Sequence, residues 1–132
     1  MISFQNENND VVGVRKDNPL PIYSSGLQPS SVTPVSETFS ASGASAKYIT
    51  PPAGRAFVIE FAPSSFIGTV DLEYSYDGTT WYKIYAGGIQ LKTWSAWGPN
   101  FIEQYSCDVT GAKFRLNCTA WTSGTLPYVL RA

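Results

Sequence analysis

The sequence predicts an all-β protein, namely an antiparallel β-sandwich or jelly roll of about eight short strands behind an extended N-terminal arm. Three observations support this prediction. After residue 38, apolar and polar residues alternate in short segments, turn residues separate the segments, and no window has a helical period. Before residue 38, Asn, Pro and Ser dominate. We therefore expect an arm over residues 1–37 and a β-domain over residues 38–132.

The arm contains two apolar stretches, Val-Val-Gly-Val at 11–14 and Leu-Pro-Ile-Tyr at 20–23. Pro19 and Pro21 remove backbone donors and favour extended conformations, so this segment suits the surface of a partner and not a central strand. A disordered tail is the alternative, although such tails rarely combine two stretches of this kind. We expect a partner to order the arm through these anchor residues: Val11, Val12, Val14, Arg15, Leu20, Ile22 and Tyr23.

The first half of the β-domain contains three expected strands, each ended by a turn or by proline: residues 38–40, 47–50 and 55–61. In the third strand, Phe57, Ile59 and Phe61 lie on one face because side chains alternate along a strand. This face is the first part of the expected core.

The clearest expected element is a hairpin around Asp77-Gly78. Residues 69–76 alternate between apolar and polar side chains, which places Asp71 and Glu73 on a polar face where solvated charges are expected. The Asp-Gly pair supplies the positive φ values that a tight hairpin turn requires. Residues 79–85 form the second arm of this hairpin.

The second half of the domain adds four expected strands: residues 89–94, 101–109, 113–120 and 128–131. Glycines at 87–88, 98, 111 and 124 separate them. The alternation over 113–120 predicts four inward side chains: Phe114, Leu116, Cys118 and Ala120.

The two cysteines, Cys107 and Cys118, lie on either side of the turn expected near Gly111. This placement permits a disulfide, whereas a reducing cytosol favours two buried thiols. The sequence favours the thiols and leaves the disulfide open. Because the chain has no histidine, two cysteines fall short of the four ligands of a structural zinc site.

Composition argues against several function classes. The net charge is −1 and Lys and Arg do not cluster, which argues against nucleic-acid binding. No apolar run approaches the roughly 18 residues of a membrane helix, and residues 1–7 lack the pattern of a secretory signal. The absence of histidine removes the commonest general base. We predict a non-enzymatic protein without cofactor or metal, made in the cytoplasm.

Four tryptophans exceed what the core of a small β-sandwich needs. Trp81 follows the hairpin turn and is expected to cap the core. Trp94 and Trp97 lie in a loop bounded by Gly and Pro, where either core packing or binding explains them. Together with Tyr85 they are the candidate surface-binding residues, suited to stacking on sugar rings or to a protein interface.

Two stretches resemble small virion proteins of tailed bacteriophages. Residues 14–21, V-R-K-D-N-P-L-P, are similar to the leader V-R-x-D-x-P-L-P of many phage structural proteins. Residues 68–81, G-T-V-D-L-E-Y-S-Y-D-G-T-T-W, resemble the hairpin G-T-V-x-L-x-x-S-x-D-G-x-T-W of phage β-sandwich proteins. Residues 111–116 and 124–125 look like the final strands of these proteins. The segment S-x-D-G-x-T-W also occurs in other β-sandwiches, including sugar-binding ones.

The resemblance implies a capsid decoration (cement) protein, or another accessory protein of the head or tail, located in the virion. The implied partner is the major capsid protein or another virion protein. Decoration proteins of this kind often form trimers, so we expect a homo-oligomer, with a trimer favoured. Two alternatives stay open: a carbohydrate- or receptor-binding β-sandwich module, and a tail or neck component.

Overall fold

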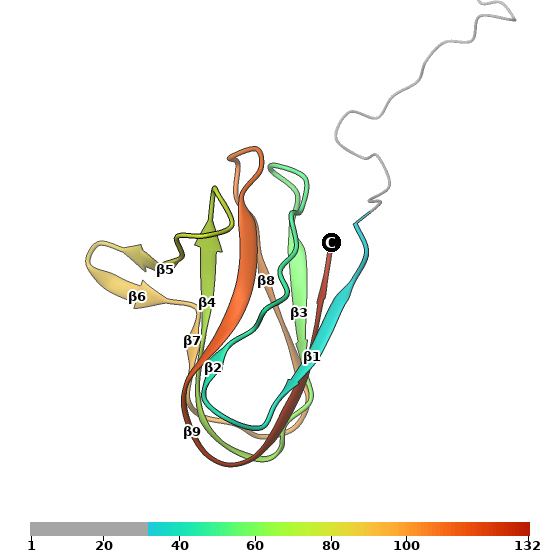
Figure 1. Cartoon of the computed structure of the whole chain (residues 1–132), viewed down its shortest axis with the longest axis vertical. Helices are drawn as coiled ribbons and strands as arrows, with labels where there is room; N and C mark the ends of the chain where they lie inside the picture. The colour runs from blue at the N-terminus through green and yellow to red at the C-terminus, as the bar shows by residue number, and fades with distance from the viewer. Residues whose placement is uncertain (1–31) are drawn as a thin grey trace, which may run out of the picture.

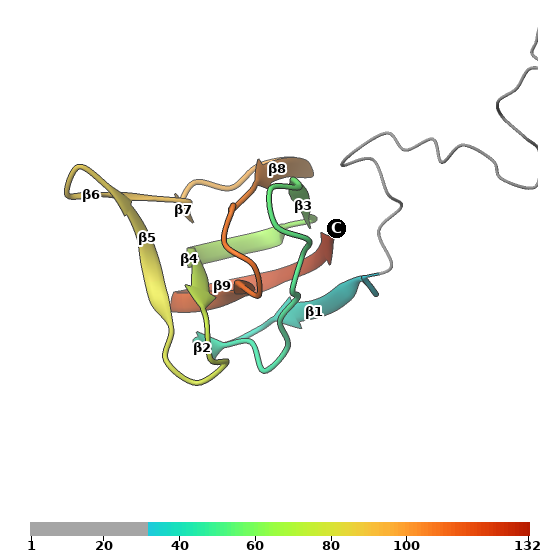
Figure 2. The same ribbon diagram turned by 90° about the horizontal axis from the view of Figure 1, so that it is seen from above.

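The structure is a computed structural model, and it describes residues 32–132. Over this range the protein is all-β, with nine strands and no helix. All strand pairs are antiparallel and belong to one curled sheet, as Figures 1 and 2 show from two directions. The expected all-β, antiparallel class is therefore confirmed. The seven predicted anchor residues of the arm, from Val11 to Tyr23, lie outside the described residues.

The long strand β9 (Lys113–Arg131) organises the sheet. Along one edge it pairs with β1 (Val35–Phe39) and β2 (Gly43–Ala44). Along the other edge it pairs with β3 (Phe57–Phe61) and β4 (Ser64–Ser75). Two strands separated by a turn at Ser123-Gly124 were expected here, but β9 is a single strand of 19 residues.

The remaining strands extend the sheet outward from β3 and β4. β8 (Phe101–Tyr105) pairs with β3, while β5 (Tyr82–Ala86) and β7 (Thr93–Trp94) both pair with β4. β6 (Ile89–Leu91) pairs only with β5 among the described strands. The β5–β6 hairpin therefore projects from the body of the sheet, on the left of Figure 1.

Close backbone approach at two glycines accompanies the bend of β9 against β4. A Cβ at Gly124 would lie 2.1 Å from the Ser65 carbonyl oxygen, and the φ of Gly124 is +78°. A Cβ at Gly68 would lie 2.4 Å from the carbonyl oxygen of Ala120. The β4–β9 register also shifts at three places between Ser64 and Val70. Such bulges bend a strand and increase its twist, which accounts for the curl.

The core lies inside the curl and receives alternate residues from both halves of β9. The even-numbered residues of each half are buried: Phe114, Leu116, Cys118, Leu126, Tyr128 and Leu130. Phe57 of β3 meets Phe114 with ring centroids 4.7 Å apart, so the two halves of the sheet share one core. The inward positions expected in β3 and in residues 114–118 are confirmed, whereas Ala120 is exposed because it lies at the bend.

Two expected strands differ from the structure in extent. The first begins at Val35 instead of residue 38, because residues 35–39 pair with Leu126–Leu130 of β9. Residues 47–50 form no strand and contribute one isolated bridge, between Ile49 and Phe114. Pro51 follows directly, and proline cannot continue a backbone ladder.

The expected tight turn at Asp77-Gly78 is also wrong. β4 ends at Ser75 and β5 begins at Tyr82, and of Asp77 and Gly78 only the glycine has a positive φ. The backbone amides of Thr79 and Thr80 each donate to Asp77 Oδ1 at 2.8 Å, and the Gly78 amide donates to Ser75 Oγ at 2.8 Å. These side-chain hydrogen bonds stabilise a wider loop in place of the two-residue turn.

The two-residue hairpin turn instead lies at Gly87-Gly88, which connects β5 and β6. Ala86 pairs with Ile89, and the φ values of the two glycines are +60° and +83°. Positive φ at both central residues is the requirement of the turn that best matches strand twist. Glycine accepts this conformation without a steric penalty.

Candidate functional site

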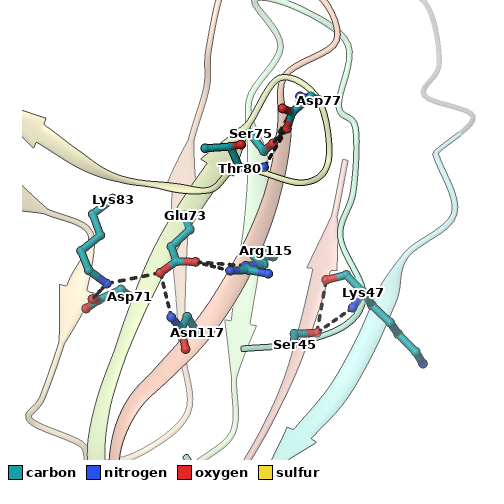
Figure 3. Close-up of polar contacts among 10 residues, drawn as sticks. All are labelled: Ser45, Lys47, Asp71, Glu73, Ser75, Asp77, Thr80, Lys83, Arg115 and Asn117. Atoms are coloured by element: carbon teal, nitrogen blue, oxygen red, sulfur yellow. Dashed lines mark hydrogen bonds and ion pairs between the residues drawn. The ribbon is translucent and has the colours of Figure 1, made fainter. Parts of the chain in front are cut away.

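A network of charged and polar side chains covers the outward face of β4. Asp71 and Glu73 are only 4% and 5% exposed, so the expectation that they are solvated is wrong. The Lys83 ammonium donates to Asp71 at 2.8 Å and to Glu73 at 3.3 Å. Arg115 and Asn117 of the neighbouring strand β9 donate to Glu73 at 3.0 and 2.8 Å (Figure 3).

The carboxylates in this network are held in their ionised form. Burial alone would raise the pKa of each carboxyl, but hydrogen bonds outweigh burial. Lys83 and Thr93 lower the pKa of Asp71, and Asn117 and Arg115 lower that of Glu73. A general acid or base at neutral pH needs a carboxyl pKa shifted upward. These two carboxylates are shifted the other way, which suits a structural role.

Trp81 belongs to this outward face and not to the core. Its ring lies against the guanidinium of Arg115, whose central carbon is 4.3 Å from the ring centroid, and its centroid is 5.7 Å from that of Tyr48. The expectation that Trp81 caps the core is therefore wrong. The Arg115 side chain points outward from β9, which places its guanidinium over the indole ring of Trp81. Cation–π attraction favours this arrangement.

The candidate binding residues Trp94 and Trp97 are half-buried against the core. The Trp94 ring centroid is 5.0 Å from that of Phe61, and Trp97 lies 5.4 Å from Phe61 and 5.1 Å from Phe66. The Trp97 indole also donates to the carbonyl of Gly68 at 2.8 Å. These contacts occupy much of the ring surface that a ligand would need.

Tyr85, the third candidate binding residue, lies on β5 with 58% of its surface exposed. Among residues 32–132, no ring contact joins it to Trp94 or Trp97. It instead contributes to the lining of a pocket of about 150 Å³ at the end of β4. The other lining residues come from the ends of β4 and β8 and the chain just after each, and from β5 and β9: Tyr74, Tyr76, Ile84, Tyr105, Cys107 and Phe114.

Four tyrosines therefore meet at this tyrosine pocket, and the sequence carried a partial signal for it. Tyr74 lies next to the end of β4 and Tyr76 directly follows the strand, so they extend its apolar face to the surface. Tyr105 and Cys107 could not be placed beside them from sequence, because the β8 segment approaches through its pairing with β3 and not with β4.

Exposed large hydrophobic side chains concentrate around the projecting hairpin. Five of the ten in residues 32–132 lie between positions 76 and 91, and all are more than 40% exposed: Tyr76, Tyr82, Tyr85, Ile89 and Leu91. We call residues 76–91 with these side chains the hairpin patch. A concentration of exposed apolar side chains is a feature of protein interaction sites.

A second feature is a hollow of about 610 Å³ on the outer side of the β1–β9–β3–β8 region. Ser36, Val129 and Glu60 form a row across its floor through their strand pairing, and Ile102 continues the row with 62% exposure. β1, the first described strand, contributes Ser36, Glu37 and Thr38 to the lining of this hollow.

Comparisons of the chain with protein-family models, with curated proteins and with solved structures found no match. In residues 32–132, no group of three metal-binding side chains is placed to hold an ion. The described residues also contain no helix able to span a membrane. Both cysteines are free thiols, as the sequence favoured, but only Cys118 is buried and Cys107 is partly exposed.

Proposed function

We propose that this protein is a non-enzymatic virion structural protein of a tailed bacteriophage, a capsid decoration (cement) protein held on the capsid by its N-terminal arm. The observation that carries the proposal is the hairpin patch, a projecting surface of apolar side chains on a domain whose buried charges are all paired. Aromatic residues are enriched at protein interfaces, because they bury much apolar area at low entropic cost.

The resemblance to phage proteins gains a physical rationale in residues 75–81. Ser75 and Asp77 hold the loop through the amides of residues 78–80, and Trp81 packs on Arg115. In the motif S-x-D-G-x-T-W, the serine, the aspartate and the tryptophan therefore stabilise the β4–β5 loop and the sheet beside it. A structural role for the motif is compatible with a protein that acts through its surfaces in an assembly.

The arm provides the second attachment in this proposal. Ordering a peptide costs about 1–2 kcal/mol per residue, so the arm requires main-chain pairing and apolar burial on its partner. The two apolar stretches at 11–14 and 20–23 supply the side chains for that burial. We propose that the major capsid protein, or another virion protein, is the partner.

We also interpret the curled sheet as an opened β-sandwich. The β1–β9–β3–β8 region and the β2–β9–β4 region would be its two layers, joined through the bend of β9. Contacts such as that of Phe57 with Phe114, which come from different regions, support this interpretation. The domain would form a homo-oligomer, with a trimer favoured, that covers the part of the hairpin patch formed by Tyr82, Ile89 and Leu91.

Two truncations of the full chain test the proposal. Deleting residues 1–24 removes both apolar stretches, and deleting residues 1–10 removes neither. Each variant is mixed with heads that lack this protein, taken from the virus that encodes it, and bound protein is measured by co-sedimentation. We expect binding by the shorter deletion and no binding by the longer one, with both folded by circular dichroism. Full binding by the longer deletion would refute the anchoring role.

Imaging of labelled protein on complete virions tests where in the virion the protein is located. Many copies on the head lattice are expected for a decoration protein. A few copies at the tail or neck would instead identify a tail or neck component with the same fold and arm.

A further inference from the structure

The tyrosine pocket has the architecture of a ligand site. Its walls are the rings of Tyr74, Tyr76, Tyr85 and Tyr105, and Cys107 contributes its thiol. Tyr74 lies edge-on to Tyr76 with centroids 5.5 Å apart, so two walls meet at a steep angle. Small-molecule sites are concave and mainly aromatic or apolar, with a few polar groups that orient the ligand.

The rings of this pocket are held from the core side. Tyr105 lies 5.6 Å from Phe114, and Phe114 lies 4.7 Å from Phe57, which is fully buried. Tyr74 is 6.5 Å from the same Phe114 ring. The inner walls therefore continue the packed core, while Tyr76 and Tyr85 form the outer, exposed walls. A site with a fixed inner wall loses little entropy on binding.

The polar groups of the pocket are neutral and available. The lining contains no Asp, Glu, Lys or Arg. The pKa of a tyrosine hydroxyl is ordinarily about 10. Burial, followed by the nearby Cys107, raises the pKa of Tyr76 and of Tyr105 further, so neither hydroxyl loses its proton at neutral pH. No tyrosine hydroxyl of the pocket is hydrogen-bonded to another residue in the range 32–132. Each can both donate to and accept from a ligand.

Size and chemistry together select the ligand class. A cavity of about 150 Å³ accommodates one six-membered ring such as benzene. An extended proline-rich peptide needs a longer groove, because its helix rises by about 3.1 Å per residue. An anion would find no cation in the lining, and a quaternary ammonium ion has no hydrogen-bond donor or acceptor for the tyrosine hydroxyls. A pyranose ring offers one face for stacking and hydroxyl groups that donate and accept.

We propose that the tyrosine pocket binds a single neutral sugar ring, stacked on an exposed tyrosine and hydrogen-bonded to the tyrosine hydroxyls. This inference does not depend on the N-terminal arm. It shares Tyr76 and Tyr85 with the hairpin patch, so it requires that an oligomer leave these two rings exposed. It also replaces Trp94 and Trp97 by Tyr76 and Tyr105 as the partners of Tyr85 in sugar recognition.

Saturation-transfer NMR with the full chain tests the proposal directly. The probes are the methyl α-pyranosides of glucose, galactose and mannose, with tetramethylammonium chloride and a Pro-Leu-Pro peptide as competing ligand classes. The variants are Tyr76→Ala and Tyr85→Ala, which each remove an exposed wall. Tyr48→Ala is the control, since Tyr48 is similarly exposed at 42% but does not line the pocket.

We expect transfer to the ring protons of at least one pyranoside, with affinity about tenfold weaker in each pocket variant, because each loses a stacking surface. The Tyr48 variant should bind like the unmodified protein. Absence of transfer to all three pyranosides would overturn the proposal, as would unchanged binding in both pocket variants. Binding of tetramethylammonium or of the peptide in place of the sugars would also overturn it.

Cys107 supplies an independent readout at the same site. It is partly exposed and lines the pocket, whereas Cys118, the only other cysteine, is 1% exposed. A bound pyranoside should therefore slow the reaction of Cys107 with N-ethylmaleimide, and the modified protein should no longer bind. An alkylation rate that a saturating pyranoside leaves unchanged would contradict occupancy of the pocket.

Discussion

The Lys83 ammonium donates a hydrogen bond to the Asp71 carboxylate at 2.8 Å, and this contact ties β5, the first strand of the projecting hairpin, to the outward face of β4. The same ammonium reaches Glu73, so one cation serves two buried anions. The network explains how a hairpin with few backbone bonds to the sheet keeps its direction.

Replacing Lys83 by Met should destabilise the protein by about 1–3 kcal/mol, because two buried carboxylates lose a shared partner. The value lies below the usual cost of breaking a buried pair, since the Lys83 side chain is 37% exposed and partly screened. Urea unfolding measures the difference. Arg131→Met is the control: it breaks the exposed pair with Glu60 and should cost less than about 1 kcal/mol. Equal losses of unfolding free energy in the two variants would show that burial of the carboxylates does not strengthen the contribution of Lys83.

Acid should destabilise the protein in a defined direction. The pKa values of Asp71, Glu73 and Asp77 are lowered in the folded state, that of Asp77 to about 2. The unfolded chain then binds more protons, so the stabilisation is complete above the unfolded values of 3.8 and 4.5 and is lost as the pH falls through the folded values. We expect a melting temperature that is level near neutral pH and falls steadily below pH ~5.

Asp77→Asn isolates one contribution to this acid transition. It keeps an oxygen that accepts the loop amides and removes the charge, so the fall in melting temperature between pH 4 and 2 should become shallower. An unchanged slope would show that the loop amides do not stabilise the ionised Asp77 side chain.

Gly124→Ala should cost about 2–4 kcal/mol, because the new Cβ meets the Ser65 carbonyl and the backbone has a positive φ. Gly87→Ala is a matched comparison: its φ is +60°, but no atom lies within 4 Å of the added Cβ. In Gly87→Ala only the left-handed backbone conformation is unfavourable for alanine, and it should cost about 1–2 kcal/mol. Thermal unfolding of both variants separates steric contact from backbone preference, and a larger loss at Gly87 would refute the close approach.

Thiol titration should distinguish the two cysteines. Burial raises the pKa of the Cys118 thiol, which also donates to the carbonyl of Ala120 at 3.3 Å, so it should react only after unfolding. Cys107 should react in the native protein. We expect one fast thiol per chain with a chromogenic disulfide reagent, absent in Cys107→Ser, and two thiols in denaturant. No reactive thiol in denaturant would indicate a disulfide.

The sequence predicted the parts of this fold that depend on local alternation. The inward faces of β3 and of residues 114–118 follow from a period of two, which the pleat imposes regardless of the rest of the chain. The continuity of β9 could not be predicted. In the sequence Gly124 indicates a turn, whereas in the structure a glycine is required there because the backbone of Ser65, some 60 residues earlier, approaches it closely.

The candidate site was harder to predict than the fold. Asp71 and Glu73 alternate like solvated residues, and their burial depends on Lys83, Arg115 and Asn117, which reach them through strand pairing. The sequence predicts Tyr85 as a surface residue, but the other tyrosines of its pocket come from β4, β8 and the residue after β4. Tertiary proximity of this kind leaves no local signal in one sequence.

The position of β9 in the chain has a consequence for biosynthesis. β1, β2, β3 and β4 share this strand as their common partner, yet residues 113–131 are translated after all four. During translation, β1 to β4 leave the ribosome before the strand with which they pair. The sheet can form only after residues 113–131 have also emerged. Pairings so distant in sequence fold slowly, which makes the nascent chain dependent on protection from aggregation until that moment.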